Sequence, residues 1–136
     1  MPVIVVTRLR LRDPGLFDQF FSAAVAVMEQ ASGSAGNLGA DVLAEANNTY
    51  WTRTAWQDRA SINAFVSAEP HLATMARISS WCDEGTFVDW EQATAELPDW
   101  QVGYDRLVAD GTSPRLTDGT DAHQTRAFPR PAVSTS

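Results

Sequence analysis

The chain has 136 residues and a formal net charge of −7, and this excess of carboxylates argues against a nucleic-acid partner, because phosphate binding needs a basic footprint. Its single cysteine, Cys82, cannot form an internal disulfide, and no CxxC motif or Cys/His cluster is present, so we expect a protein of the reducing cytoplasm without a structural metal. The length fits one domain, and no stretch approaches membrane-spanning length, so we expect no membrane partner.

The first half of the chain alternates between strand and helix patterns. Residues 3–11 alternate their side chains with the period of two that is typical of a strand. Asp13 and Pro14 supply an N-cap and a first helical position, and apolar residues at helical spacing follow to about residue 31. After a glycine-rich turn, residues 38–46 and 49–56 form two strand patterns around an Asn-Asn turn signal, which predicts a hairpin.

The middle of the chain adds a second helical region and a fourth strand. Asp58 is placed to cap a helix, and Pro70 opens the next turn, in which Leu72 and Met75 share one stripe. Residues 86–92 alternate again and predict a strand. The order is therefore β-α-β-β-α-β, a ferredoxin-like α+β subunit whose single antiparallel sheet has helices on one face only.

The uncovered face of such a sheet carries large side chains and has to be buried. A second copy of the same sheet is the simplest cover, so we expect a homodimer whose two sheets form a dimeric α/β barrel. Residues 99–111 predict a short helix that packs on the partner or on the end of the barrel. We expect the domain to span residues 1–111, and residues 112–136, which lack periodicity and have few large apolar side chains, to form a disordered or draped tail.

Three segments of the sequence form a further pattern. They are the strand YWTRTAW at residues 50–56, Phe65 followed by His71, and Trp81 ahead of a strand that bears Trp90. Together they resemble an uncharacterised family of small dimeric α/β-barrel proteins related to spheroidene monooxygenase, a haem-containing enzyme, and more remotely the antibiotic-biosynthesis monooxygenases. The resemblance covers residues 3–108. It implies a small-molecule monooxygenase that is either cofactor-free, with the deprotonated substrate itself activating dioxygen, or haem-dependent.

His71 is the first candidate for a catalytic residue. It lies at the start of a helix, where the positive end of the macrodipole favours the neutral ring. A neutral imidazole can act as a general base, donate a hydrogen bond to a substrate oxygen or ligate haem iron, and the resemblance places a histidine at this position. The alternative is a solvent-facing residue that only satisfies a backbone group. We expect no metal other than the iron of a haem, if haem is the cofactor.

Two arginines and a set of aromatic side chains complete the predicted site. Arg53 and Arg8 lie on strands that we expect to be central, and in a barrel interior each needs an anion. This anion is a substrate carboxylate, a haem propionate or an internal partner such as Asp41, Glu45 or Asp89. We assign Arg53 as a catalytic anion clamp and Arg8 to substrate binding. A pocket for a small hydrophobic, aromatic or polyene molecule would be lined by Tyr50, Trp51, Trp56, Phe65, Trp81 and Trp90.

The same pocket is compatible with two other functions. One alternative is a non-catalytic dimer that binds a hydrophobic ligand or has a structural role. The other is an isomerase or cyclase, because a base in a dry pocket also serves enolisation without oxygen.

Overall fold

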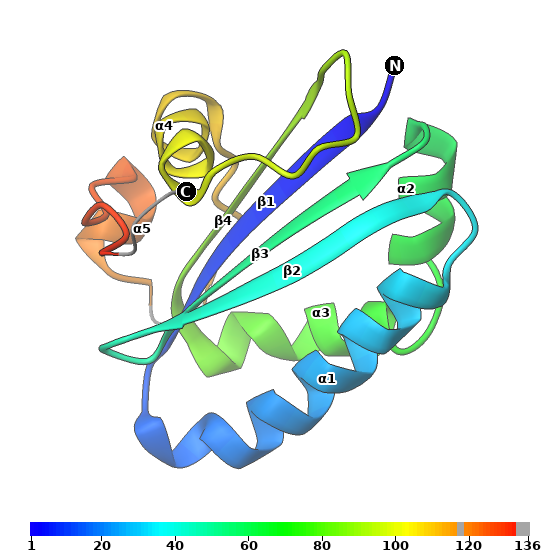
Figure 1. The fold of residues 1–136 in the computed structure, drawn as a ribbon. Helices are drawn as coiled ribbons and strands as arrows, with labels where there is room; N and C mark the ends of the chain where they lie inside the picture. Colours follow the sequence, from blue (N-terminus) through cyan, green and yellow to red (C-terminus); the bar gives the residue numbers. More distant parts are fainter. Residues whose placement is uncertain (117–118, 133–136) are drawn as a thin grey trace.

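A computed structural model describes residues 1–116 and 119–132, and its centre is a four-stranded antiparallel sheet with the strand order β2-β3-β1-β4 (Figure 1). The strands are β1 (Val3–Leu11), β2 (Asn37–Glu45), β3 (Thr49–Trp56) and β4 (Cys82–Glu91). Strand β1 pairs with both β3 and β4, and β2 pairs with β3, all antiparallel. This arrangement confirms the predicted ferredoxin-like α+β subunit.

Three helices cover one face of the sheet (Figure 1). They are α1 (Phe17–Gly33), α2 (Arg59–Val66) and α3 (His71–Trp81). The carboxylate of Asp13 accepts a hydrogen bond from the backbone N–H of Gly15 and starts a short 3-10 helix, Pro14–Leu16, that leads into α1. The carboxylate of Asp58 accepts from the N–H of Ser61 and caps α2. Both N-caps predicted from the sequence are therefore confirmed.

Strand β4 begins at Cys82, directly after α3, rather than at residue 86. Glu84 is paired with Arg8 and is buried within the strand. A register shift between Arg10 and Leu11 lets Cys82 pair with Leu11 and join the core beneath the helices. Burial raises the pKa of the Cys82 thiol to about 12, with a smaller contribution from a neighbouring carboxylate, so the thiol is inert.

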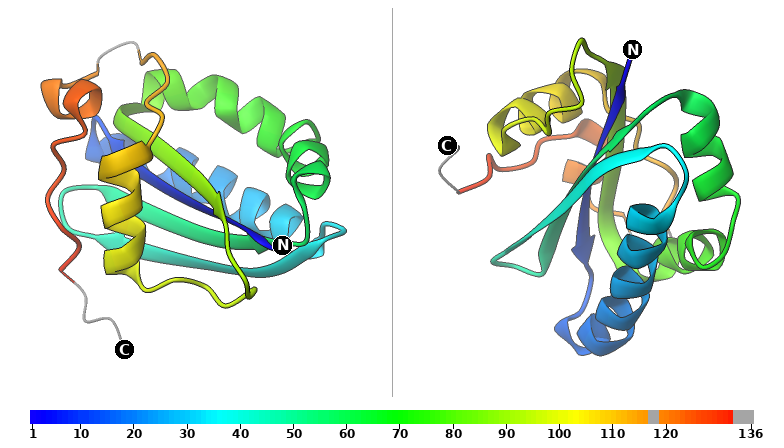
Figure 2. Two further views of the ribbon diagram at one scale, coloured as in Figure 1. Left: turned by 90° about the horizontal axis from the view of Figure 1, so that it is seen from above. Right: turned by 45° about the vertical axis from the view of Figure 1, so that its right-hand side comes forward.

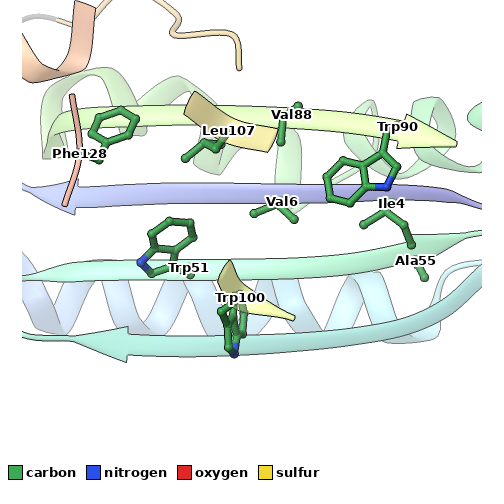
Figure 3. Packing of buried hydrophobic residues seen from close by; sticks show 9 residues of the cluster. All are labelled: Ile4, Val6, Trp51, Ala55, Val88, Trp90, Trp100, Leu107 and Phe128. Carbon is green, nitrogen blue, oxygen red and sulfur yellow. The ribbon is translucent and has the colours of Figure 1, made fainter. Parts of the chain in front are cut away.

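The C-terminal part of the same chain covers the opposite face of the sheet. Helix α4 (Trp100–Asp110) contacts β4 and β1, and α5 (Asp121–Thr125) contacts β4. Figure 2 shows both helices and the segment after them on the side away from α1, α2 and α3. The apolar cluster on this face is buried (Figure 3) and consists of Ile4, Val6, Trp51, Ala55, Val88, Trp90, Trp100, Leu107 and Phe128.

The sequence led us to expect that a second copy of the sheet buries this face, and within the single chain α4 and the segment after α5 already lie on it. Helix α4 was expected to pack on a partner or on the barrel end, but Trp100 and Leu107 instead insert into the cluster on their own sheet. Leu107 is 0% exposed, and Phe128 contributes a further ring from the segment after α5. The chain itself therefore supplies the apolar surface that the prediction assigned to a partner.

The described part of the predicted tail packs along the domain, whereas residues 117–118 and 133–136 lie outside the described residues. Thr112 exchanges two backbone hydrogen bonds with Phe87 of β4, at 2.8 and 3.0 Å. His123 is 4% exposed, its Nδ1 accepts from the backbone N–H of Gly85, and its Nε2 lies 2.7 Å from the carbonyl oxygen of Pro114. These contacts attach the segment to the outer strand of the sheet.

The described chain contains no helix that is long and apolar enough to cross a membrane.

Candidate functional site

The predicted site residues lie on two different faces of the sheet. The face beneath the helices holds Tyr50, Trp56, Phe65, His71 and Trp81. The face beneath α4 holds Arg8, Trp51, Arg53 and Trp90. Alternate residues of a strand point to opposite faces, so Arg53 and Trp56 of β3 are separated by the sheet. The predicted combination of His71 with Arg53 is therefore not assembled.

On the helix-covered face, Trp56, Phe65 and His71 form a line of aromatic rings. The ring centroids of Trp56 and Phe65 are 5.0 Å apart, and those of Phe65 and His71 are 4.7 Å apart. Trp56 is buried, whereas Phe65 and His71 are half-buried, so the line runs from the core to the surface. Tyr50 and Trp81 pack at the other end of this face, and the six steps along the strand from Tyr50 to Trp56 span about 20 Å.

His71 is the first residue of α3, and the turn before the helix fixes its ring. Nδ1 of His71 lies 3.1 Å from the carbonyl oxygen of Val66. A carbonyl oxygen can only accept, so Nδ1 carries the hydrogen and Nε2 of the neutral ring keeps its lone pair. Burial lowers the pKa of His71 below 6.5, and the bond to Val66 opposes this effect only in part. Desolvation therefore favours the neutral ring, with Nε2 as its basic atom.

Gln30 on α1 positions the turn that holds His71, and sequence reasoning missed it. Its Oε1 accepts from the backbone N–H of His71 at 2.9 Å. Its Nε2 donates to the carbonyl oxygens of Phe65 and Ala68 at 3.0 and 3.3 Å. One amide thus satisfies three backbone groups where α2 ends and α3 begins. In the sequence Gln30 is an ordinary polar helix residue, and only the interruption at Pro70 indicates that such groups need a partner.

A hollow of ≈ 380 Å³ lies beside this turn, between the C-terminal half of α1 and α2. The hollow is wide open to solvent, and His71 lies next to it without being one of its lining residues. Phe65 and Gln30 belong to its lining, together with Glu29 and Glu69. The lining therefore joins one aromatic face, one amide and two carboxylates.

The residues near His71 do not fit a haem. A bound haem needs an axial ligand and cationic or hydrogen-bonding partners for its propionates. Nε2 of His71 could ligate iron, but the adjacent hollow is lined by Glu29 and Glu69 and by no arginine. In the part of the chain that the structure describes, no group of three or more His, Cys, Asp or Glu residues is arranged to hold a metal ion.

Arg53 attaches α4 to the sheet. Its Nε and Nη2 donate to Oδ2 of Asp41 at 3.2 and 2.5 Å, and its Nη1 donates to the carbonyl oxygen of Pro98 at 2.6 Å. The guanidinium carbon lies 4.2 Å from the ring centroid of Trp100. Both edges and one face of the guanidinium are therefore engaged. Arg53 has the internal partner Asp41 that the sequence analysis named as an alternative to a bound anion.

Arg8 is buried beneath the C-terminal segment and paired with Glu84. Arg8 is 3% exposed, and its Nη1 donates to Oε1 of Glu84 at 2.6 Å. Oε2 of Glu84 accepts from Arg10 and from Thr120. Burial acts to raise the pKa of Glu84, but the hydrogen bonds and charges of Arg8, Thr120 and Arg10 together hold it below its ordinary value. Glu84 is therefore a charged partner that orients both arginines.

The fold and the helix-covered face together define a ferredoxin-like protein with a neutral, half-buried histidine at the end of an aromatic line. The family model for antibiotic biosynthesis monooxygenase matches residues 2–77, which is more than half of the chain. The chain belongs to this family. The matched residues contain β1, β2, β3, α1 and α2 and end within α3, so they include His71.

Similar solved structures have the same fold. A crystal structure of an antibiotic biosynthesis monooxygenase is 16% identical, with a TM-score of 0.60, and the match covers 68% of this chain and 99% of the other. SnoaB, a cofactor-independent oxygenase from Streptomyces nogalater, is 14% identical, with a TM-score of 0.57 and coverage of 68% and 94%. Rv0793 from Mycobacterium tuberculosis is 14% identical, with a TM-score of 0.61 and coverage of 69% and 100%. No curated protein matches the sequence significantly.

Proposed function

We propose that this protein is a small-molecule monooxygenase-like enzyme that acts on a flat aromatic or polyene metabolite at the helix-covered face, with His71 as the base. The family match over residues 2–77 carries the proposal, because this segment contains His71 and the aromatic line that leads to it. The neutral ring of His71, with a lone pair on Nε2, supports the role of a base. The half-buried ring of Phe65 offers a flat apolar surface at the hollow.

In the proposed reaction, Nε2 of His71 removes a proton from an acidic O–H or C–H group of the substrate. The resulting anion passes electrons to dioxygen, a C–O bond forms, and the proton held by His71 returns to the peroxide. Loss of water from this hydroperoxide, with the second hydrogen of the same carbon, leaves a carbonyl group. The substrate is therefore the reductant, and the reaction needs no metal or flavin. A half-buried position limits the access of water to the reacting anion. Gln30 holds the backbone of His71 in place, which keeps Nε2 aligned with the substrate.

We propose a cofactor-free reaction rather than a haem-dependent one. The acidic lining beside Phe65 supports this choice, because it offers the propionates of a haem no cation. The description of SnoaB as a cofactor-independent oxygenase also supports it, since SnoaB has a similar fold.

We also propose a homodimer, with an interface that differs from the sheet-to-sheet barrel. Helix α4 and residues 126–132 occupy the face that such a barrel needs. Exposed apolar side chains on α1 and on the edge strand β2 offer another surface, with Phe21 at 54%, Val25 at 40% and Val42 at 56% exposure.

Oxygen uptake measured with a panel of quinols and polyphenols tests the proposed activity. We expect the wild-type protein to consume oxygen with at least one of these substrates and His71→Gln to lose about 100-fold or more of the rate, the typical contribution of a general base. Met75→Leu, on the exposed surface of the same helix, is the matched control and should keep the wild-type rate.

Three outcomes would contradict the proposal. A rate in His71→Gln equal to that of the wild type would remove His71 from the chemistry. Product that forms equally well under argon would identify an isomerase or cyclase. A Soret band in the purified protein that disappears in His71→Ala would establish haem.

A further inference from the structure

A second hollow, of ≈ 510 Å³, lies on the opposite face of the sheet, between the β2–β3 turn and the segment formed by residues 126–132. Its strand side includes Arg8 and Arg10 of β1 and Glu84 of β4. Pro129 and Arg130 of the C-terminal segment line its other side. The sheet separates this hollow from His71, so it is distinct from the site of the proposed reaction.

Arg8 has one engaged edge and one free edge. Its Nη1 donates to Glu84, and its guanidinium carbon lies 4.4 Å from the ring centroid of Phe128. Within the described residues its Nε is buried without any hydrogen-bond partner, and no bond is made by Nη2. An arginine binds a carboxylate side-on through Nε and Nη2, as Arg53 binds Asp41 in this protein. This is the edge that a carboxylate would use, and because Nε is closed to solvent, the residues over it have to shift when a ligand enters.

The two carboxylates in the lining do not satisfy this edge. Glu84 is already shared by Arg8, Arg10 and Thr120. Glu45 accepts from the indole N–H of Trp51 and from the backbone N–H of Ala132, each at 2.8 Å. Both carboxylates are thus held by other donors. A buried guanidinium donor without an acceptor is rare in folded proteins, and a ligand oxygen would supply the missing acceptor.

The remaining surface of the hollow suits an apolar group. Ala44, Ala46, Pro129 and Ala132 contribute small apolar side chains beside the arginines. Two of the three arginines in the lining have partners beyond it, because Arg10 also pairs with Asp83 and Arg130 pairs with Asp105. Arg8 is therefore the arginine of the lining whose guanidinium keeps donors for a ligand.

We propose that this hollow binds a small organic carboxylate. The carboxylate group lies on the Nε and Nη2 edge of Arg8, with Arg10 adding charge, and the apolar body of the ligand lies against the alanines and Pro129. The C-terminal segment that closes the sheet face also forms one wall of the hollow, so the ligand bridges the strands and that segment.

Titration calorimetry on the purified full chain tests the proposal with three probes, which are benzoate, its neutral analogue benzamide and inorganic phosphate. We expect benzoate to bind, benzamide to give no heat and phosphate to bind more weakly than benzoate. Phosphate that binds as well as benzoate would show a general oxyanion site and would overturn the assignment to carboxylates. The absence of benzoate binding would overturn the site itself.

Two variants locate the binding site. Arg8→Lys keeps a charge beside Glu84 but removes the side-on edge, so benzoate should bind at least about tenfold more weakly. Arg59→Lys, an exposed arginine paired with Asp89 on the other face, is the matched control and should bind benzoate as the wild type does. Ala46→Leu fills part of the hollow without removing an ion pair, so it should also weaken benzoate binding at least about tenfold. It tests the location of the site if Arg8→Lys does not fold. Unchanged benzoate affinity in Ala46→Leu would contradict the proposed location.

Discussion

His71 and His123, the two histidines of the chain, show how backbone groups determine what a ring can do. In His71, Nδ1 donates to the carbonyl of Val66, and the half-buried ring keeps a basic Nε2. In His123, Nδ1 accepts from the N–H of Gly85 and Nε2 donates to the carbonyl of Pro114. Both nitrogens of His123 are thus engaged, Nδ1 with β4 and Nε2 with the segment that precedes α5. Only His71 combines partial exposure with a basic nitrogen, which is why the proposed chemistry rests on it.

The lowered pKa of His71 predicts a pH-dependent stability. Burial places the pKa in the folded protein below 6.5, so between these two values the unfolded chain binds a proton that the folded chain does not. The contribution of His71 is therefore fully present above pH 6.5 and is lost as the pH falls from 6.5 through the folded-state pKa. We expect the difference in free energy of unfolding between the wild type and His71→Gln to shrink over this interval.

Urea denaturation of both proteins at a series of pH values measures this difference. Comparing the two proteins removes the effect of the carboxylates, which titrate in both. A difference that stays constant from neutral to acidic pH would show that desolvation does not set the pKa of His71.

Helix α4 depends on Arg53, which joins β3 to the N-terminal end of the helix through Pro98 and Trp100. Replacing Arg53 with methionine removes the hydrogen bond to Pro98, the contact with Trp100 and the pair with Asp41. We expect a loss of about 1–3 kcal/mol in the free energy of unfolding, the usual range for such a hydrogen bond and cation–π contact. Chemical denaturation gives the free energy, and hydrogen exchange should show faster exchange within residues 100–110.

Arg59→Met, which removes an exposed ion pair with Asp89, serves as the control and should leave the stability close to that of the wild type, because exposed ion pairs contribute little. If Arg53→Met kept the wild-type stability but lost oxygen uptake, Arg53 would act at the site as the anion clamp suggested by the sequence.

The elements that the sequence predicted well are those with strong local signals. Asp13 and Asp58 are N-cap residues that accept from a backbone N–H two and three residues ahead, and this requires only local chain geometry. The stripe of Leu72 and Met75 was less informative, because both side chains are more than 40% exposed and α3 buries Ile78 and Trp81 instead. Periodicity shows that a helix is present, but a short helix with apolar residues on several sides does not reveal which side faces the sheet.

The candidate site was predicted only in part, because it depends on contacts between distant segments. His71 was found from its place behind Pro70. Its contact with Phe65, and the contact of Phe65 with Trp56, join two of the segments on which the family resemblance rests. The face on which Arg53 lies could be derived only with the register of β3 in hand, since one step along a strand reverses the direction of a side chain. Gln30 satisfies backbone groups 35 to 41 residues away, and no local pattern carries that information.

At the scale of the whole molecule, the two faces of the sheet are covered by different segments of the chain. The helices on one face belong largely to the segment that matches the family, which ends at residue 77. The cover on the other face comes from α4, α5 and residues 126–132, all of which follow that segment. The proposed reaction belongs to the first face and the proposed carboxylate site to the second. The two sites can therefore be altered independently.

This cover predicts how the tryptophans on the sheet face beneath α4 behave in solution. Because Trp51, Trp90 and Trp100 are buried by their own chain, we expect tryptophan emission to be independent of protein concentration, even where light scattering shows a change in oligomeric state. A sheet-to-sheet dimer would instead bury these rings only on assembly, and its emission would shift to the red on dilution.

Leu107→Asp should displace α4, because it places a charge at a position that is 0% exposed. Its emission should be red-shifted at every concentration, and its newly exposed face should promote self-association. Val102→Asp changes a residue of the same helix that is 46% exposed and should resemble the wild type. A concentration-dependent red shift in the wild-type protein would contradict the closed face and restore the dimeric barrel.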